Sequence, residues 1–392
     1  MHSSLAPSDR SGVEPFHVMD VWAAAAERQR RVGDLINLSA GQPSTPAPAA
    51  VRAAAAAALE TEVLGYTVAL GIPELREGIA AHYGRSYGID VAPDDVVVTT
   101  AGSGGFQLAF LAAFDAGDRV AMARPGYPCY RNILTALGCE VVELPCGPET
   151  RFQPTVAMLE DLDEPVQGLV VASPANPTGT VLDPAELAAL AAYCQEHGTW
   201  LISDEIYHGL SYPGAPATAS AWETSREAIV VNSFSKYFSM TGWRLGWLLV
   251  PEVLRRAVDR LTGNLTICPP ALPQYAAVAA FTPESYAEAD SHVERYATNR
   301  SLLLEGLPRL GIDRLAPADG AFYVYADVGH LTDDSMRFTY ELLGEVGVAV
   351  APGIDFDPVE GRRFIRISFA GATAPIEAAL ERLGPFIAKR SS

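Results

Sequence analysis

The sequence predicts an α/β protein, in which a mostly parallel sheet of seven strands is covered by helices on both faces and a smaller α+β domain lies beside it. Short β-branched runs alternate with helical segments between residues 95 and 250. After residue 275 the pattern changes to long helices separated by single strands. A chain of 392 residues with 49% apolar and 19% charged side chains can bury the cores of two or three domains.

The seven strands are predicted from apolar runs that turn residues interrupt. Helical segments lie between several of them, at residues 106–114, 130–137 and 184–197. Because strands that alternate with helices form parallel crossover units, we expect a parallel sheet buried on both faces. The predicted strands are residues 96–100, 119–123, 140–144, 168–172, 199–203, 229–233 and 245–250.

The two ends of the chain are predicted to form the smaller domain. A helix around residues 22–29 precedes a short strand at 36–39, and an alanine-rich helix follows at 49–60 because alanine is the best helix former. Near the C-terminus we predict helices at 283–307 and 335–345 and strands at 320–326, 347–351 and 364–369. The predicted division is a large domain of residues 45–275 and a small domain of residues 1–44 and 276–392.

Charge and composition exclude several classes of function. A net charge of −19 argues against binding to nucleic acid, which needs clustered Lys and Arg. No apolar run reaches the roughly 18 residues of a membrane span, and the first residues lack the pattern of a signal peptide, so we expect a cytoplasmic protein with no membrane partner. Five cysteines without C-x-x-C spacing and seven scattered histidines predict no metal site.

Lys236 is the candidate catalytic residue. Serines precede it at Ser233 and Ser235, Arg244 follows it, and an apolar run lies just before it. Most lysines in a folded protein are solvated surface charges. Here two hydroxyls and a guanidinium can hold a phosphate beside the amine, which favours a Schiff-base lysine that serves a phosphorylated aldehyde.

Other polar residues follow the predicted strands at their carboxyl ends, where open α/β sheets bind ligands. A glycine-rich segment from Gly102 follows the first strand, Asn176 follows the fourth, and Asp204 and Tyr207 follow the fifth. Taken singly, the glycines suit an ordinary helix start, Asn176 suits a turn and Asp204 suits a helix cap. Their joint placement favours one ligand site.

These motifs together resemble those of the class I/II aminotransferases, which are fold type I enzymes dependent on pyridoxal 5′-phosphate. The resemblance extends over nearly all of residues 36–370. Its motifs are Leu38-x-x-Gly41-x-Pro43, Tyr66-x-x-x-x-Gly71-x-x-Glu74-Leu75-Arg76, Pro125-Gly126-Tyr127, Asn176-Pro177-Thr178-Gly179, Asp204-Glu205-x-Tyr207, the run around Lys236, and Phe364-Ile365-Arg366-Ile367-Ser368.

The resemblance implies a role for each residue near the cofactor ring. Lys236 would form the Schiff base with pyridoxal 5′-phosphate and then carry a proton between the substrate and the cofactor. Asp204 would keep the pyridine nitrogen protonated, because a nearby carboxylate favours the charged form. Asn176 and Tyr207 would hydrogen-bond the ring oxygen, and Tyr127 would stack on the ring.

The resemblance also implies how the charged groups of the ligands are held. The α-carboxylate of the substrate would bind Arg366, aided by Gly41 and Asn176. Tyr66 would reach the phosphate of a partner subunit, which implies a homodimer with shared active sites. Within one subunit the phosphate would be bound by Gly102, Ser103 and Gly104 at a helix N-terminus, together with Ser233, Ser235 and Arg244.

The function that the resemblance implies is transfer of an amino group from an L-amino acid to a 2-oxo acid by a ping-pong mechanism. A β- or γ-elimination, or formation of a carbon–carbon bond, would use the same residues and stays an alternative. An aminotransferase-like ligand sensor of a transcription regulator is disfavoured, because the residues before Leu38 are too few for a DNA-binding module.

Two positions bear on the substrate. Aspartate-specific relatives often supply a second cation for the side-chain carboxylate, and in one branch it is a lysine at the position that Gly104 occupies here. The segment of residues 16–22, near the part of relatives that lines the substrate pocket, contains Phe16 and Trp22. It suggests a bulkier or less polar substrate, although a packing role for the two aromatic residues fits equally well. The amino donor and acceptor stay open.

Overall fold

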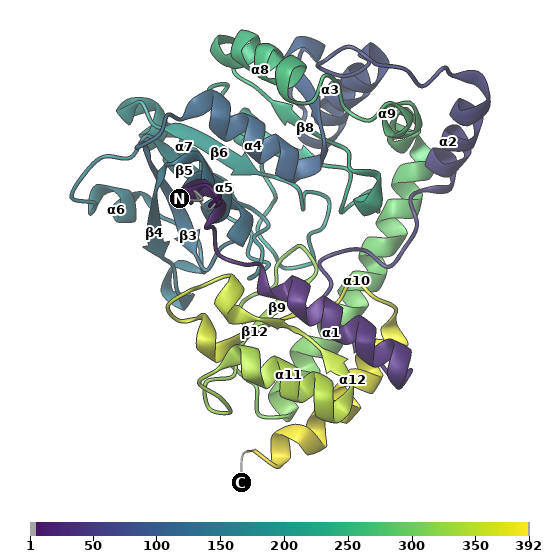
Figure 1. Ribbon diagram of the computed structural model, residues 1–392, viewed down its shortest axis with the longest axis vertical. Helices are drawn as coiled ribbons and strands as arrows, with labels where there is room; N and C mark the ends of the chain where they lie inside the picture. Colours follow the sequence, from purple (N-terminus) through teal and green to yellow (C-terminus); the bar gives the residue numbers. More distant parts are fainter. Residues whose placement is uncertain (1–4, 391–392) are drawn as a thin grey trace.

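The computed structural model describes residues 5–390, and its largest element is the predicted seven-stranded sheet (Figure 1). The strand order is β2-β8-β7-β6-β5-β3-β4, and within this sheet β8 alone runs antiparallel to its neighbours. The predicted α/β class with a mostly parallel sheet is therefore confirmed. The strands are β2 (Val96–Thr99), β3 (Arg119–Arg124), β4 (Glu140–Pro145), β5 (Gly168–Ala172), β6 (Trp200–Asp204), β7 (Ile229–Ser233) and β8 (Gly246–Leu249).

Helices cover both faces of this sheet because successive side chains of each strand point to opposite sides. Leu169 and Val171 of β5 pack into one core, and Val170 between them packs into the other. The face that contains Val170 is covered by α4 (Ala101–Ala113), α5 (Pro128–Leu137) and α8 (Glu252–Leu265). The other face is covered by α2 (Ala49–Thr61), α3 (Pro73–Tyr87), α6 (Val156–Glu160), α7 (Pro184–His197) and α9 (Ala271–Ala277).

A second core lies below the large sheet in Figure 1 and is built on a three-stranded antiparallel sheet. Apolar residues such as Leu303, Val324, Phe338 and Ile367 fill this core. The long helix α10 contacts both α2 and β9, so it joins the two parts of the molecule. The elements are α10 (Pro283–Arg309), β9 (Tyr323–Asp327), α11 (Ser335–Val346), β11 (Ala351–Pro352), β12 (Phe364–Ser368) and α12 (Thr373–Ala388).

The predicted single strand at residues 347–351 is wrong, because two strands stand in its place. β10 (Val348–Ala349) pairs with β1 (Ile36–Asn37), and β11 pairs with β12. The chain passes from one ladder to the other at Val350. The partners of these strands come from distant parts of the sequence, so the local pattern could not show the change of sheet.

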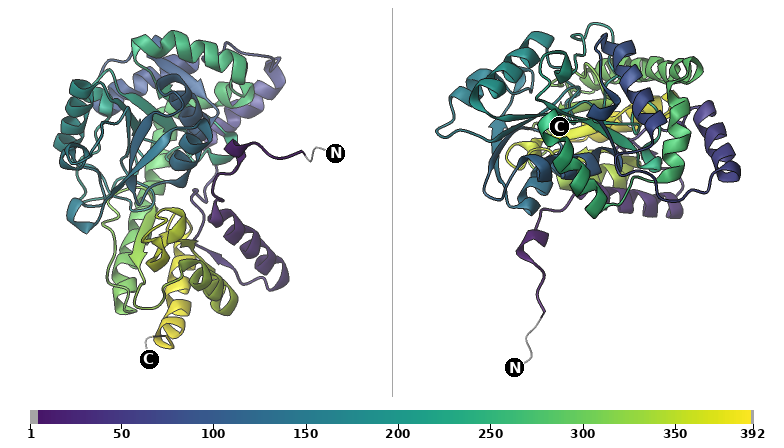
Figure 2. Two further views of the ribbon diagram at one scale, coloured as in Figure 1. Left: turned by 60° about the vertical axis from the view of Figure 1, so that its left-hand side comes forward. Right: turned by 90° about the horizontal axis from the view of Figure 1, so that it is seen from above.

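The N-terminal helix α1 (His17–Arg31) begins before the predicted residue 22 and lies against α11, β10 and β11. Figures 1 and 2 show it beside the three-stranded part of the molecule. Val18 packs in a cluster with Tyr325 and Phe356. The proposed division at residues 44/45 and 275/276 stays a prediction, and its residues 1–4 and 391–392 lie outside the described chain.

Two further properties concern residues 5–390 as a whole. None of the helices in this range combines the length and the apolar character that crossing a membrane requires. Within the same range, no three His, Cys, Asp or Glu side chains are grouped so that they could hold a metal ion.

Candidate active site

A cavity of about 200 Å³ lies at the carboxyl ends of β5, β6 and β7, where Arg366 of β12 also reaches it. The structure therefore brings most of the predicted site residues together. Those that line the cavity are Gly41, Gly102, Ser103, Tyr127, Asn176, Asp204, Tyr207, Ser233, Ser235, Lys236, Arg244 and Arg366.

Two predicted residues do not line the cavity. The α-carbon of Gly104 faces Thr100, whose Oγ1 would collide with a β-carbon at that position. Tyr66, in the segment between α2 and α3, is 84% exposed on the outer surface. Tyr66 could therefore contact an active site only if the active site of a second subunit lay against this surface.

Lys236 lies three residues after the end of β7, and its Nζ donates a hydrogen bond to the backbone oxygen of Gly41 at 2.6 Å. Burial and, after it, the positive charge of Arg366 lower the pKa of Lys236 to about 7, although the charge of Asp204 opposes the shift. A substantial fraction of this amine is therefore unprotonated, and thus nucleophilic, near neutral pH.

Lysine content alone also singles out Lys236. The chain has 28 Lys and Arg residues, of which only Lys236 and Lys389 are lysines. The side chain of Lys389 is 75% exposed near the C-terminus. In a protein that otherwise uses arginine for its positive charges, a lysine in the central sheet region is a signal that sequence reasoning could have used.

Asp204 ends β6, and both of its carboxylate oxygens accept hydrogen bonds. The backbone N–H of Ile206 donates to Oδ1 at 3.0 Å, and the hydroxyl of Tyr130 donates to Oδ2. Burial raises the pKa of Asp204 to about 6, while the bonds from Tyr130 and Ile206 and the charge of Lys236 oppose this rise. The carboxylate is thus mostly ionised at neutral pH and can stabilise a protonated ring nitrogen.

Tyr130 was not predicted as a site residue. It lies one helical turn after Tyr127, at the start of α5, and both side chains line the cavity. Residues three apart on a helix share a face, so the spacing of the two tyrosines was the signal that the sequence offered.

Arg366 is 3% exposed and is held in place by two hydrogen bonds. Its Nη1 donates to Oδ1 of Asn176 and its Nη2 to the backbone oxygen of Ser39, each at 2.9 Å. Its guanidinium carbon lies 4.3 Å from the centre of the Tyr323 ring. Among the described residues, none accepts a hydrogen bond from its buried Nε. A fixed guanidinium with an unused donor suits a carboxylate.

Tyr323 of β9 is a second site residue that sequence reasoning missed. Its hydroxyl lies 2.7 Å from that of Tyr207, so the two hydroxyls are hydrogen-bonded. A β-carbon on Gly41 would lie 2.7 Å from the same hydroxyl of Tyr323. Glycine at position 41 is therefore required for Tyr323 to reach Tyr207. No local pattern in the strand distinguishes Tyr323 from a core residue.

The wall nearest α4 suits a phosphate group. The first turn of α4 places Gly102 and Ser103 on the cavity, where a helix N-terminus has unpaired N–H groups and a positive dipole end. The Ser233 hydroxyl donates to the Ser235 hydroxyl at 2.8 Å. Arg244 lines the same cavity and its Nη1 donates to the backbone oxygen of Thr241 at 3.0 Å. These donors fit a phosphorylated aldehyde whose carbonyl meets Lys236.

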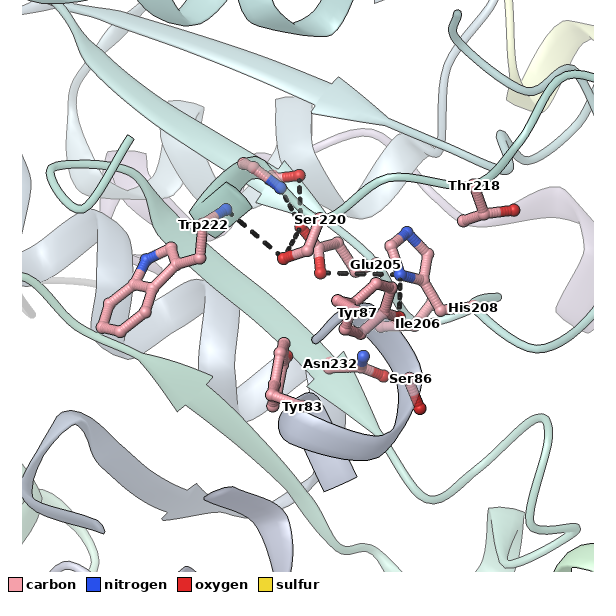
Figure 3. A network of polar contacts seen from close by, with 12 residues as sticks. Tyr83, Ser86, Tyr87, Glu205, Ile206, His208, Thr218, Ser220, Trp222 and Asn232 are labelled. Carbon is pink, nitrogen blue, oxygen red and sulfur yellow. Dashed lines mark hydrogen bonds and ion pairs between the residues drawn. The ribbon is translucent and has the colours of Figure 1, made fainter. Parts of the chain in front are cut away.

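A buried polar network lies next to Asp204 and includes Glu205 and His208 (Figure 3). Oε1 of Glu205 accepts from the backbone N–H of Ala221 at 2.8 Å and from the Ser220 hydroxyl at 3.1 Å. Nδ1 of His208 lies 2.5 Å from the hydroxyl of Tyr87 on α3. Burial raises the pKa of Glu205 to about 8 and lowers that of His208 to about 3. These contacts anchor the segment from which Asp204 and Tyr207 reach the cavity.

The remaining wall is largely apolar. The N-terminal segment and α1 contribute Phe16, Val18, Met19 and Trp22. Of the described residues that line the cavity, the basic ones are Lys236, Arg244 and Arg366, and the one acidic residue is Asp204. If Lys236 reacts with the aldehyde, Arg244 binds a phosphate and Arg366 binds a carboxylate, none of these described basic residues is left for a second carboxylate of the substrate.

Comparison with known proteins is consistent with this geometry. Residues 33–383 match the model of the family "Aminotransferase class I and II". A valine–pyruvate aminotransferase of Mycobacterium tuberculosis is 70% identical, with 96% of this chain and 97% of that protein covered. An aspartate/prephenate aminotransferase of Thermus thermophilus is 36% identical, with coverage of 94% and 95%. The crystal structure of an aminotransferase from M. tuberculosis superposes with a TM-score of 0.98 at 68% identity, with coverage of 98% and 100%.

Proposed function

We propose, from the premise that the chain belongs to the class I and II aminotransferase family and is an enzyme of amino-group transfer, that its substrates are an L-amino acid with an apolar side chain and a small 2-oxo acid. We further propose that it works with pyridoxal 5′-phosphate in a ping-pong mechanism. The observation that carries the proposal is one cavity that holds a lysine of lowered pKa, a buried carboxylate and a fixed arginine.

The cofactor would be held by the groups that the structure places on the cavity. When bound, pyridoxal 5′-phosphate supplies an aldehyde for the lysine amine and a ring that accepts the electron pair released at the substrate α-carbon. Its ring would lie between Asp204, Tyr127, Asn176 and Tyr207. Its phosphate would be bound by Gly102 and Ser103 at the α4 N-terminus, together with Ser233, Ser235 and Arg244, whereas the predicted Gly104 does not line the cavity.

The side chains of the cavity would divide the work on the substrate and the cofactor. Arg366 binds the α-carboxylate through its fixed guanidinium, with the backbone of Gly41 beside it. Lys236, released as a free amine, would take the proton from the substrate α-carbon on its Nζ and would then deliver this proton to the cofactor. Asp204 holds the proton on the ring nitrogen, and the bond from Tyr130 keeps this carboxylate ionised.

The apolar wall supports an uncharged substrate side chain. Phe16, Val18, Met19 and Trp22 face the cavity, and the basic residues among its described lining are Lys236, Arg244 and Arg366. The name of the 70% identical relative, valine–pyruvate aminotransferase, agrees with this wall. Valine and pyruvate are therefore the first pair to test as donor and acceptor.

We also propose a homodimer with shared active sites. Apolar side chains are exposed in the last turns of α2, where Leu59 is 60% exposed, and in the segment between α2 and α3, where Val63 is 97% and Val68 is 58% exposed. Monomers rarely leave such a patch open to water. Tyr66 lies within this segment, in the position from which a partner subunit could use it.

A half-reaction tests the proposal. The enzyme loaded with pyridoxal 5′-phosphate is mixed with single amino acids in the absence of any 2-oxo acid, and the visible absorbance of the cofactor is followed. We expect valine to convert the spectrum to that of the aminated cofactor with release of one equivalent of 2-oxo acid. Release of ammonia with an unchanged cofactor would instead indicate elimination, and aspartate as the best donor would contradict the apolar assignment.

A further inference from the structure

We infer that Asp355 is a positioning residue that holds α1 against the cavity and thereby sets the preference for amino acids with apolar side chains. The inference rests on the proposed function, because it concerns the wall that would contact the substrate side chain.

The evidence begins with the N-terminus of α1. Oδ1 of Asp355 accepts from the backbone N–H of His17 at 2.8 Å, and Oδ2 accepts from that of Val18 at 2.7 Å. Asp355 itself is 2% exposed. Phe16, the residue that precedes the helix, makes no side-chain cap bond. The cap of α1 thus comes from a residue far away in the sequence, which follows β11 in a short 3₁₀ helix (Gly353–Asp355).

The residues that this cap holds are the ones that form the apolar wall. Val18 donates one of the two bonds, and Phe16 and Met19 flank the capped residues in the chain. The ring of Phe16 also meets that of Tyr127 edge to face, with centres 6.2 Å apart. If the first turn of α1 moved, the wall that faces the substrate side chain would move with it, while Lys236 and Arg366 would stay in place.

The carboxylate of Asp355 is buried beside hydrogen-bond donors and positive charges. Burial raises its pKa, whereas the N–H groups of His17 and Val18 and the positive charges of His17 and Arg366 oppose the rise. The backbone oxygen of Asp355 accepts from Nη2 of Arg131 on α5 at 3.3 Å. Asp355 is therefore in contact with α1 and with α5, and its carboxylate faces the positive end of the α1 dipole.

The test compares Asp355→Asn with Asp334→Asn. The amide at 355 keeps one acceptor but presents an NH₂ group to the second N–H of α1. Asp334 caps α11 through the backbone N–H of Arg337 at 3.0 Å and does not line the cavity, so its variant controls for the loss of a cap. kcat and KM are measured for valine and for alanine, whose single methyl group would reach less of the wall than the side chain of valine.

For Asp355→Asn we expect KM for valine to rise about 10-fold with a smaller change in kcat. Valine has two side-chain carbons more than alanine, and contacts of such carbons with an apolar pocket contribute at least this factor to the preference for valine. The parameters for alanine should change by less than about 3-fold, and Asp334→Asn should leave the ratio of valine to alanine unaltered. In the cofactor-free protein, hydrogen exchange at the amides of residues 17–19 should accelerate in Asp355→Asn and not in Asp334→Asn.

Equal losses for valine and alanine would show that Asp355 only stabilises the fold, and unchanged parameters for both would also overturn the inference. If Asp355→Asn does not fold, Asp355→Ser takes its place, because serine keeps one acceptor at the cap. It is expected to raise KM for valine more than KM for alanine. Equal losses for the two substrates in this variant would contradict the inference. If the unaltered enzyme converts no amino acid, the proposed function fails. Independently of that result, the role of Asp355 as the cap of α1 would be refuted if hydrogen exchange at residues 17–19 did not accelerate in Asp355→Asn.

Discussion

Arg366 donates a hydrogen bond to Oδ1 of Asn176 across 2.9 Å, and this bond joins the three-stranded sheet to the loop that follows β5 of the large sheet. The bond also orients the amide of Asn176. Because its oxygen is directed to Arg366, its NH₂ group points elsewhere and can donate to a ligand. The group that would bind the substrate carboxylate therefore positions a group that would bind the cofactor.

Replacing Arg366 by Gln should reduce kcat/KM for valine by about 10- to 100-fold, since a hydrogen bond to a charged group contributes ~1.5–3 kcal/mol. The loss should come chiefly through KM, and steady-state kinetics will measure it. Isobutylamine, which is valine without its carboxylate, is the matched control substrate, and its slow amination of the cofactor should change little. An equal loss with isobutylamine would mean that Arg366 does not act by binding the carboxylate.

Gly41→Ala should destabilise the site, because the new methyl carbon would lie 2.7 Å from the Tyr323 hydroxyl. We expect a loss of about 1–3 kcal/mol in stability, measured by denaturant unfolding, together with reduced activity. Tyr323→Phe removes the colliding oxygen, so the double variant should recover part of the stability. Strictly additive effects in this double-mutant cycle would show that the two residues do not compete for the same space.

Capture of pyridoxal 5′-phosphate by the cofactor-free enzyme should accelerate as the pH rises through about 7 and then level off. The sign follows because the lowered pKa of Lys236, due first to burial and then to Arg366, leaves the reactive neutral amine present above this pH. Stopped-flow absorbance measures the rate, and Arg366→Gln should move the midpoint to higher pH.

Borohydride reduction followed by peptide mass analysis provides the control for this pH experiment. The cofactor should be attached to Lys236, and Lys389→Ala should behave as the unaltered enzyme. A rate that kept rising toward pH 10, as for an ordinary lysine, would contradict the lowered pKa.

The exposed segment between α2 and α3 should be part of the subunit interface. Val63→Asp is expected to convert the proposed dimer to a monomer, as measured by analytical ultracentrifugation, because a charge would be buried against the apolar partner surface. Val359→Asp, at a position that is 57% exposed in the other part of the molecule, is the matched control.

Tyr66→Phe tests the sharing of the active sites. This variant should stay dimeric and bind the cofactor about 10-fold more weakly, which corresponds to one lost hydrogen bond to a phosphate. Unaltered cofactor affinity in a dimeric Tyr66→Phe would argue against shared sites.

The sequence by itself determined the seven strands and the grouping of Lys236, Asp204 and Asn176. Strands and helices have local periodicities, and parallel strands in one sheet bring their carboxyl ends to the same edge, so the residues that follow them must meet. The local pattern did not show that residues 347–351 form two strands in place of one. The two halves of this segment pair with β1 and β12, which lie elsewhere in the chain.

Only the tertiary structure decided which further side chains complete the site. Tyr323 reaches Tyr207 from β9, and Asp355 caps α1 from more than 300 positions away in the chain. In sequence, each of these residues has the pattern of an ordinary strand or loop position. Its role depends on how the three-stranded sheet packs against the large sheet, and that packing is set by the burial of two separate cores and by no local pattern.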